Sequence, residues 1–134
     1  MNVDIKIIPH HKQRYRTCGD WTQEEGDLHI FVSKLPDWRF ESLIAVHELV
    51  EALICTKQGI TQEIVDAFDE NYERERDDGF HGPEDEPGDD PSAPYHFAHS
   101  IATGVERILS VALGVRWKSY EEAVLALDRP KVAP

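Results

Sequence analysis

The 134-residue chain contains only two cysteines, Cys18 and Cys55, which lie far apart in the sequence. This spacing fits neither a disulfide framework nor a zinc-binding cysteine pair, so we expect reduced thiols. The sequence also lacks any apolar run near the roughly twenty residues that a membrane-spanning helix needs, and we expect no membrane partner. The first residues lack the basic and apolar segments of a secretory signal. We therefore expect an intracellular, cytoplasmic protein.

Basic residues are scarce, because 14 Lys and Arg stand against 26 Asp and Glu and give a formal net charge of −12 at pH 7. A surface with this charge repels a phosphate backbone, so we expect no nucleic-acid partner. The hydrophobic content of 40% is that of an ordinary folded domain. A chain of this length suits one compact core, and we treat residues 1–134 as a single domain.

Residues 1–35 have the pattern of strands, and residues 36–128 have the pattern of helices. We predict strands at 3–8, 15–21 and 28–33, the last of which alternates apolar and polar side chains with a period of two. The connection between the second and third strands is polar and contains glycine, which is typical of a hairpin loop. The sequence thus predicts an α+β fold, with a small three-stranded antiparallel sheet followed by about four helices.

Capping residues set the limits of the predicted helices. Asp37 is a suitable N-cap and Gly59 a suitable C-terminal breaker for the first helix, and Thr61 can cap the second. Ser119 and Glu122 form a capping box for the fourth. The predicted helices cover residues 38–57, 62–76, 94–113 and 119–129.

A long acidic loop is predicted at residues 77–94, where acid, glycine and proline occur without periodicity. Its carboxylates could bind Ca²⁺ or a basic partner, but they lack the ligand spacing of an EF-hand. Because the loop ends beside His96 and His99, we expect it to flank a site there and to be able to act as a lid.

The motif that carries chemistry is His47-Glu48-Leu49-Val50-Glu51, within the first predicted helix. Residues four apart share a helix face, so His47 and Glu51 can bind one metal ion. Both fall at the edge of the apolar side of this helix, which should be buried. Catalytic zinc takes three protein ligands and one water, and we predict His47, Glu51 and His99 as those ligands. Glu48 is then the natural general base for the water.

The third predicted helix offers one more candidate. Its apolar side is formed by Phe97, Ile101, Val105, Ile108 and Ala112. His99, Thr103 and Glu106 cluster on an adjoining strip. Glu106 could orient His99 from behind or replace it as the third ligand, and the sequence leaves both roles open.

At these residues the chain resembles the zincin metallohydrolases, whose helix carries His-Glu-x-x-His and whose sheet edge lies beside the metal to hold extended substrate. The match comprises His47, Glu48 and position 51, where Glu51 stands in place of the second histidine, and the preceding strand at 28–33. The resemblance implies a zinc-dependent hydrolase, for example of a peptide or amide bond, in which Glu48 activates water. The whole chain is also similar to small uncharacterised phage and prophage proteins that share the His-Glu-Leu-Val-Glu and Glu-Pro-Gly-Asp stretches, which implies no activity.

Two other functions fit the same sequence. Glu48, Glu51, Glu63 and Asp66 resemble the Glu-x-x-Glu and Glu-x-x-Asp pair of the all-α nucleotide pyrophosphohydrolases, which implies Mg²⁺ and cleavage of nucleoside triphosphates. Alternatively, the chain is a non-enzymatic structural or interaction protein of phage origin, whose acids are solvated and whose histidines pack or form hydrogen bonds. Cys55 is either a soft ligand or, as we prefer, a buried thiol. The sequence names no substrate and no oligomeric state.

Overall fold

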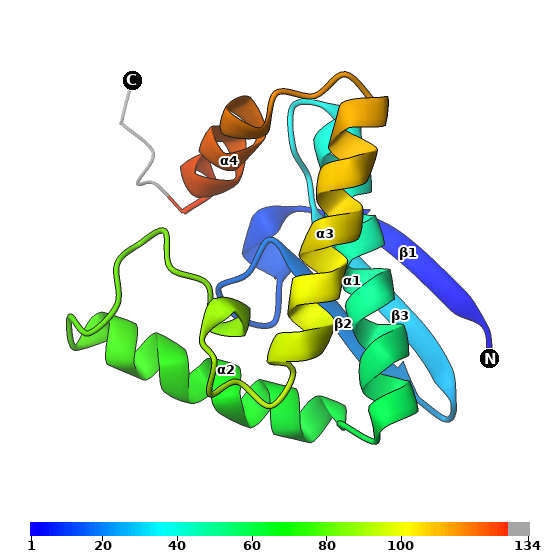
Figure 1. Ribbon diagram of the computed structural model, residues 1–134, viewed down its shortest axis with the longest axis vertical. Helices are drawn as coiled ribbons and strands as arrows, with labels where there is room; N and C mark the ends of the chain where they lie inside the picture. The colour runs from blue at the N-terminus through cyan, green and yellow to red at the C-terminus, as the bar shows by residue number, and fades with distance from the viewer. Residues whose placement is uncertain (129–134) are drawn as a thin grey trace.

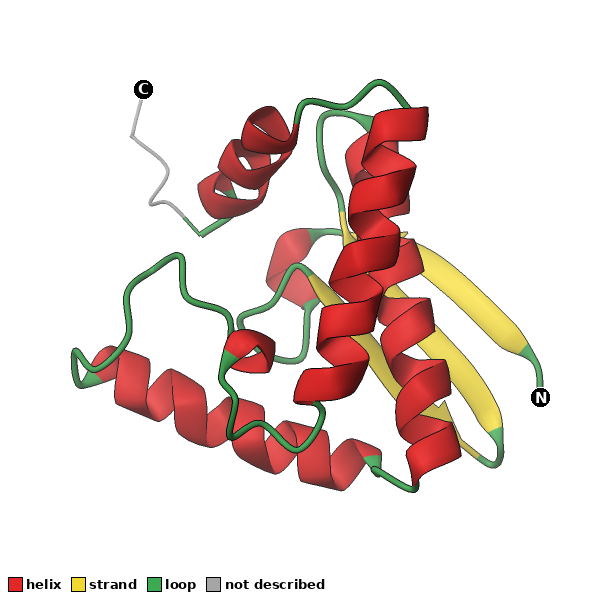
Figure 2. Cartoon of the chain, in the orientation of Figure 1, coloured by secondary structure: helices red, strands yellow, loops and turns green. Residues whose placement is uncertain are grey.

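The structure is a computed structural model that describes residues 1–128 (Figures 1 and 2). It confirms the α+β class and the three strands and four helices. The predicted end of the last helix at residue 129 lies outside the described residues. The elements are β1 (Val3–Ile8), the 3₁₀ turn η1 (His10–Lys12), β2 (Gly19–Glu24), β3 (Asp27–Ser33), α1 (Trp38–Gln58), α2 (Gln62–Asp77), the 3₁₀ turn η2 (Pro87–Asp89), α3 (His96–Ala112) and α4 (Trp117–Ala126).

The prediction of an antiparallel sheet is wrong, because the sheet is mixed. The strand order is β1-β3-β2, with β1 parallel and β2 antiparallel to the central β3. Residues 9–18 carry the chain from one edge of the sheet to the other, and they are too long for a tight hairpin. Gln13 fixes this crossing, since its side-chain amide donates to the carbonyls of Cys18 and Phe31.

The second strand starts at Gly19, later than the predicted residue 15, because the preceding residues belong to that crossing. β2 and β3 are joined by Glu25 and Gly26, which have φ of 51° and 81°. Two successive residues with positive φ define the type I′ turn, whose twist matches that of the flanking strands. The predicted hairpin between the second and third strands is therefore confirmed.

Helix α1 lies between two layers, with the sheet on one side and α3 on the other (Figure 1). The caps at Asp37 and Gly59 are confirmed: the Asp37 side chain accepts from the backbone N–H of Arg39, and Gly59 is left-handed. A helix covered on two sides needs apolar residues around most of its circumference. The predicted burial of one side only is therefore wrong, because Leu53 is exposed whereas Ile44, on another side, is buried.

The core fills the space between the sheet and α1. β2, β3 and α1 contribute Trp21, Leu28, Ile30, Val32, Leu43 and Ile44 to it. α2 is capped by Thr61 as predicted and contacts β2 and η2. The predicted capping box at Ser119 is wrong, since α4 begins two residues earlier at Trp117 with Arg116 as N-cap. Across residues 1–128, no helix has both the length and the apolar character needed to cross a membrane.

Helix α3 turns its apolar side to solvent and its polar strip to α1. The buried residues of α3 are small or polar, namely Ala98, His99, Ala102, Glu106 and Ser110. They meet α1, which contributes His47 and Glu51 to the same contact. Small side chains let two helix backbones approach closely. The close packing of α1 and α3 is what positions the candidate site.

Candidate functional site

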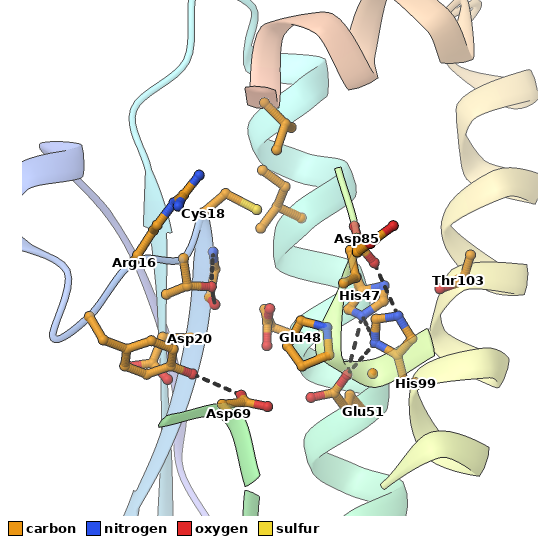
Figure 3. Close-up of a pocket in the computed structure, with 18 of the residues that line it drawn as sticks. Arg16, Cys18, Asp20, His47, Glu48, Glu51, Asp69, Asp85, His99 and Thr103 are labelled. Carbon is orange, nitrogen blue, oxygen red and sulfur yellow. Dashed lines mark hydrogen bonds and ion pairs between the residues drawn. The ribbon is translucent and has the colours of Figure 1, made fainter. Parts of the chain in front are cut away.

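Three side-chain donors from α1 and α3 converge on one point (Figure 3). His47 Nε2 lies 3.2 Å from Glu51 Oε2 and 3.2 Å from His99 Nδ1. The three atoms form a triangle, and its third side, from His99 Nδ1 to Glu51 Oε2, is 3.0 Å. Ligand atoms at the zinc distance of about 2.0–2.1 Å in a tetrahedron lie roughly 3.3 Å apart. The triangle therefore has nearly the dimensions of three tetrahedral zinc ligands.

Two local features of the sequence build this triangle. The spacing of four between His47 and Glu51 places both on one face of α1. His99 comes from the first turn of α3, and the alanines of the α1–α3 contact bring its ring to a centroid distance of 4.7 Å from that of His47. All three side chains are buried, with exposed fractions of 6% to 8%. The structure thus brings together the three residues that the sequence singled out as metal ligands.

The second ring nitrogen of each histidine faces carboxylates. His47 Nδ1 lies 2.7 Å from Glu106 Oε1. His99 Nε2 lies 3.2 Å from Glu86 Oε2 and 3.1 Å from Asp89 Oδ1. A proton held by the carboxylate on one nitrogen leaves the lone pair of the other nitrogen free for a metal. Both rings are therefore placed to present their lone pairs to the centre of the triangle.

Glu51 is oriented by Trp21 of β2. The indole Nε1 of Trp21 donates to Glu51 Oε1 over 3.2 Å, and the other carboxylate oxygen faces the histidines. Trp21 itself is buried in the core. The carboxylate thus has one oxygen held by the sheet and the other available for a single metal–oxygen bond.

The charge of the cluster favours a cation. Burial alone would lower the pKa of His47, but hydrogen bonds to Glu106 and Glu51 outweigh it and raise that pKa to about 11. Burial likewise opposes protonation of His99, yet hydrogen bonds to Glu51 and Glu86 raise its pKa to about 10. Burial would raise the pKa of Glu51, whereas the two histidines lower it to about 2. In the metal-free site the carboxylates therefore hold both rings protonated at neutral pH, and a metal ion that binds there would replace this positive charge by displacing one proton from each ring.

Glu48 lies beside the triangle, on the side of β2. Figure 3 shows its carboxylate between the histidines and the segment that contains Cys18 and Asp20. A Cβ at Gly19 would come within 2.7 Å of Glu48 Oε1, so this close approach to the strand depends on glycine. Burial and the charge of Glu51 raise the pKa of Glu48 well above its usual value. A carboxylate whose pKa is raised is a stronger proton acceptor than an ordinary one.

A buried acid on α2 faces the same space. Asp69 accepts hydrogen bonds from the phenol groups of Tyr15 and Tyr95. Burial, together with the charge of Glu51, raises the pKa of Asp69 to about 7 although those hydrogen bonds oppose the shift. Sequence reasoning missed this residue, because Tyr15, Asp69 and Tyr95 are distant in sequence and form no recognisable spacing.

The acidic loop meets the site at His99, as predicted. Gly88 in η2 is buried, and a Cβ there would lie 2.3 Å from Cγ of His99. The loop backbone therefore packs directly on the imidazole ring. Glu86 and Asp89, on either side of this glycine, reach His99 Nε2. The sequence predicted that this loop flanks the site but not which of its residues contact His99.

A cavity of about 370 Å³ opens beside the triangle. It lies between β2, α1, the start of α3, α2 and the acidic loop, and Glu48, Asp69 and Thr103 contribute to its lining. This volume is in the usual range for a small-molecule or side-chain pocket. The candidate metal donors are thus accessible to a ligand although they are buried.

The remaining residues singled out by sequence lie as follows. The sequence left open whether Glu106 orients His99 or replaces it as a ligand. In the structure Glu106 contacts His47 and not His99, so the contact that it makes is an orienting one to the other histidine. Asp66 is paired with Arg14, and Glu63 is exposed. Within residues 1–128, no group of three or more side chains able to hold one metal ion includes Glu63, Asp66 or Cys55. Cys55 is a buried free thiol.

Comparisons of the chain with protein-family models, with curated proteins and with solved structures find no match.

Proposed function

We propose that the chain is a metal-dependent hydrolase with one zinc site, formed by His47, Glu51 and His99, and with Glu48 as the general base. The observation that supports this most is the triangle of donor atoms with sides of 3.0 to 3.2 Å. Its two histidines each turn their second nitrogen to a carboxylate, which is the arrangement typical of zinc-binding histidines. A packed or merely hydrogen-bonded pair of histidines has no need of that arrangement on both rings.

The chemistry follows from the positions of the side chains. A zinc ion at this point would polarise a substrate carbonyl and make a water molecule acidic enough to act as a nucleophile near neutral pH. Glu48 lies next to the donors without being one of them, so it can take the proton from the attacking water and pass it to the leaving group. Glu106, Glu86 and Asp89 hold the rings of His47 and His99 in the required orientation.

An extended peptide fits this site better than a nucleotide does. Residues Gly19 and Trp21 of β2 line the cavity, and β2 is an edge strand of the sheet. The backbone N–H and carbonyl of Gly19 are hydrogen-bonded to Thr17, and the N–H of Gln23 is hydrogen-bonded to Gln62, so an extended peptide would pair only with the stretch of β2 between them. The resemblance to zincins also supports an extended peptide substrate, because in that family the sheet edge next to the metal holds extended substrate. We therefore propose hydrolysis of a peptide or related amide bond.

The hypothesis of a magnesium-dependent nucleotide pyrophosphohydrolase has less support. Mg²⁺ prefers oxygen ligands, and the triangle contains two imidazole nitrogens. The pyrophosphohydrolase pattern also needs Glu63 and Asp66 next to Glu48 and Glu51, whereas Asp66 is paired with Arg14.

Elemental analysis tests the proposed site. The chain, purified without an affinity tag, is dialysed against zinc and then against metal-free buffer, and zinc is measured by mass spectrometry. We expect one zinc per chain, and less than a tenth of that in His47→Ala, Glu51→Ala or His99→Ala. Glu63→Ala removes an exposed acid and is the matched control, which should keep the zinc. Retention of zinc in all three ligand variants would contradict the site.

Glu48→Gln separates the base from the ligands. This variant should keep one zinc per chain and lose about 10²–10⁴-fold in the rate of hydrolysis of a fluorogenic peptide library, because it removes only the proton acceptor. Loss of zinc in Glu48→Gln would show that Glu48 is a ligand. Unchanged turnover would show that it is not the base.

A further inference from the structure

The outward face of α3 is apolar along its whole length. Five large side chains are exposed on it, by 36% to 80%: Phe97, Ile101, Val105, Ile108 and Val111. We call this set the α3 stripe. α3 packs on α1 and contacts η2 with its opposite side, and among residues 1–128 Figure 1 shows no other element in front of it. The stripe exposes on the order of 500 Å² of apolar surface, which is near the upper limit for the largest patch of a monomer.

The charges on α3 indicate what kind of partner covers the stripe. Of its two Asp, Glu, Lys or Arg residues, Glu106 is buried, and Arg107 lies 4.2 Å over the ring of Trp117. The stripe is thus uncharged in a chain whose formal net charge is −12. A basic partner would gain no ion pair here. Two copies of this chain, however, can meet at this face without burying a carboxylate.

Gly104 gives an independent reason for a partner. It is the middle residue of α3, and a Cβ added to it would meet nothing within 4 Å. Glycine destabilises the interior of a helix relative to alanine, and no neighbour within the described chain requires it at this position. A second helix that crosses α3 at this point does require it, because close approach of two backbones leaves no room for a side chain.

The ends of the stripe are symmetric about Gly104. Phe97 and Val111 lie seven positions before and after it, whereas Ile108 and Ile101 would face Ser100 and Arg107 across a two-fold axis at Gly104, at four and three positions from it. In an antiparallel pair of α3 helices that cross at Gly104, Phe97 of one copy faces Val111 of the other. Such mutual pairing is the property of an interface with two-fold symmetry. We propose that two copies of this chain form a dimer through α3, antiparallel, with the two-fold axis at Gly104.

Sedimentation of the full chain tests the dimer. Ile108→Glu places a charge near the centre of the stripe at a side chain that is 73% exposed, so it should not disturb the fold. Ile5→Glu is the matched control, because Ile5 is 48% exposed on the edge strand β1. We expect a dimer at micromolar concentration, a dissociation constant at least 100-fold higher in Ile108→Glu, and no change in Ile5→Glu.

Three results would overturn the dimer. The first is a wild-type chain that is monomeric at 100 µM, whether or not it binds phosphatidylcholine vesicles through the stripe. The second is a dimer that withstands Ile108→Glu. The third is a dimer that Ile5→Glu dissociates, because this result would place the contact at the sheet edge.

Gly104→Ala gives two opposite expected effects. In the monomeric Ile108→Glu background the alanine should raise the melting temperature, because alanine favours the helix and nothing lies in its way. In the otherwise unchanged chain it should raise the dissociation constant of the dimer at least tenfold. A dimer that Gly104→Ala leaves unchanged or tightens would contradict the close crossing of the helices.

Cysteine cross-linking tests the orientation. Ser100 and Ile108 lie four positions before and after Gly104, so they should face each other across the axis. A mixture of Ser100→Cys and Ile108→Cys chains should give disulfide-linked heterodimers in excess over either linked homodimer. An excess of linked Ser100→Cys homodimers would indicate parallel helices and overturn the proposal.

Discussion

The residues around the candidate site form two sets: one set faces the proposed metal position, and the other holds the first set in orientation. His47, Glu51 and His99 point one atom each at a common centre, while Glu106, Trp21 and the loop carboxylates hold the atoms behind them. Outer contacts of this kind fix ring orientation and ligand basicity, and their loss typically weakens metal binding by about 10–100-fold. The contact between Gly88 and His99 belongs to the same set, although it is steric and not polar.

Substitution of Gly88 tests this steric contact. In Gly88→Ala the new Cβ would lie 2.3 Å from His99 Cγ, so the ring or the loop backbone must move. We expect zinc affinity to fall at least tenfold in a competition titration with a chelating dye. Gly82→Ala is the matched control in the same loop, because its Cβ would come no closer than 3.4 Å to another atom. Equal affinities of the two variants would show that the loop does not position His99.

The protonation of Asp69 should make the free energy of unfolding depend on pH. Its folded pKa of about 7 lies above the ordinary value of 3.8, so it favours the folded state fully below pH 3.8 and loses this contribution as the pH rises towards 7. The neutral Asp69→Asn removes this loss and can still accept from Tyr15 or Tyr95. We expect the variant to gain on the order of 4 kcal/mol relative to the wild type between pH 4 and pH 8 in urea unfolding of the metal-free chain. A constant difference between the two proteins would contradict the buried, proton-holding state of Asp69.

Among the elements, α1 and α3 decide whether a site exists. Ala98 and Ala102 of α3 have no exposed surface, and α3 packs against α1. The short side chains set the distance between the helices, and this distance sets the 3.2 Å between the two histidine nitrogens. Larger residues along this contact would separate His47 from His99 without touching either.

Ala102→Leu tests this role of the helix contact. The larger side chain overpacks the interface, and we expect a loss of stability of about 1–3 kcal/mol in denaturant unfolding together with loss of zinc binding. The same substitution at the exposed Ala112, near the end of the same helix, should leave both unchanged. If Ala102→Leu kept full zinc affinity, the spacing of the helices would not be what holds the donors together.

The sequence predicted those elements whose signals are local. The caps Asp37, Gly59 and Thr61 fixed the helix limits, and the spacing of four brought His47 and Glu51 together, because both features depend on neighbouring residues. The sheet order could not be read in this way, since it depends on the path of residues 9–18 across β3. The same limit explains Glu106: which histidine it meets depends on how α3 is rotated against α1.

For the whole molecule, a metal at this site would link three segments that are far apart in sequence. α1 supplies two donors, α3 supplies one, and the acidic loop holds His99 from behind. A ligand that binds only the folded state stabilises it by an amount that grows with its free concentration. The metal should therefore stabilise the fold as a whole as well as the site.

Chelation tests this coupling. At a free zinc concentration 100 times the dissociation constant, binding contributes about 2.7 kcal/mol, which corresponds to a rise in melting temperature of roughly 10 °C for a chain of this size. We expect EDTA to reverse the rise in the wild type and to have no effect on His99→Ala, measured by calorimetry. A wild-type melting temperature that is the same with zinc and with EDTA would show that the folded state binds no zinc.

The proposed site is defined by the atoms that surround the metal, and zinc K-edge X-ray absorption of the zinc-loaded chain reports these atoms directly. The account predicts four light-atom neighbours at about 2.0–2.1 Å, with the scattering pattern of two imidazole rings in the wild type and of one ring in any zinc retained by His99→Ala. A sulfur neighbour at about 2.3 Å would assign the zinc to a cysteine, and an octahedral shell without imidazole would assign it to the acidic surface. Either result would contradict the site formed by His47, Glu51 and His99.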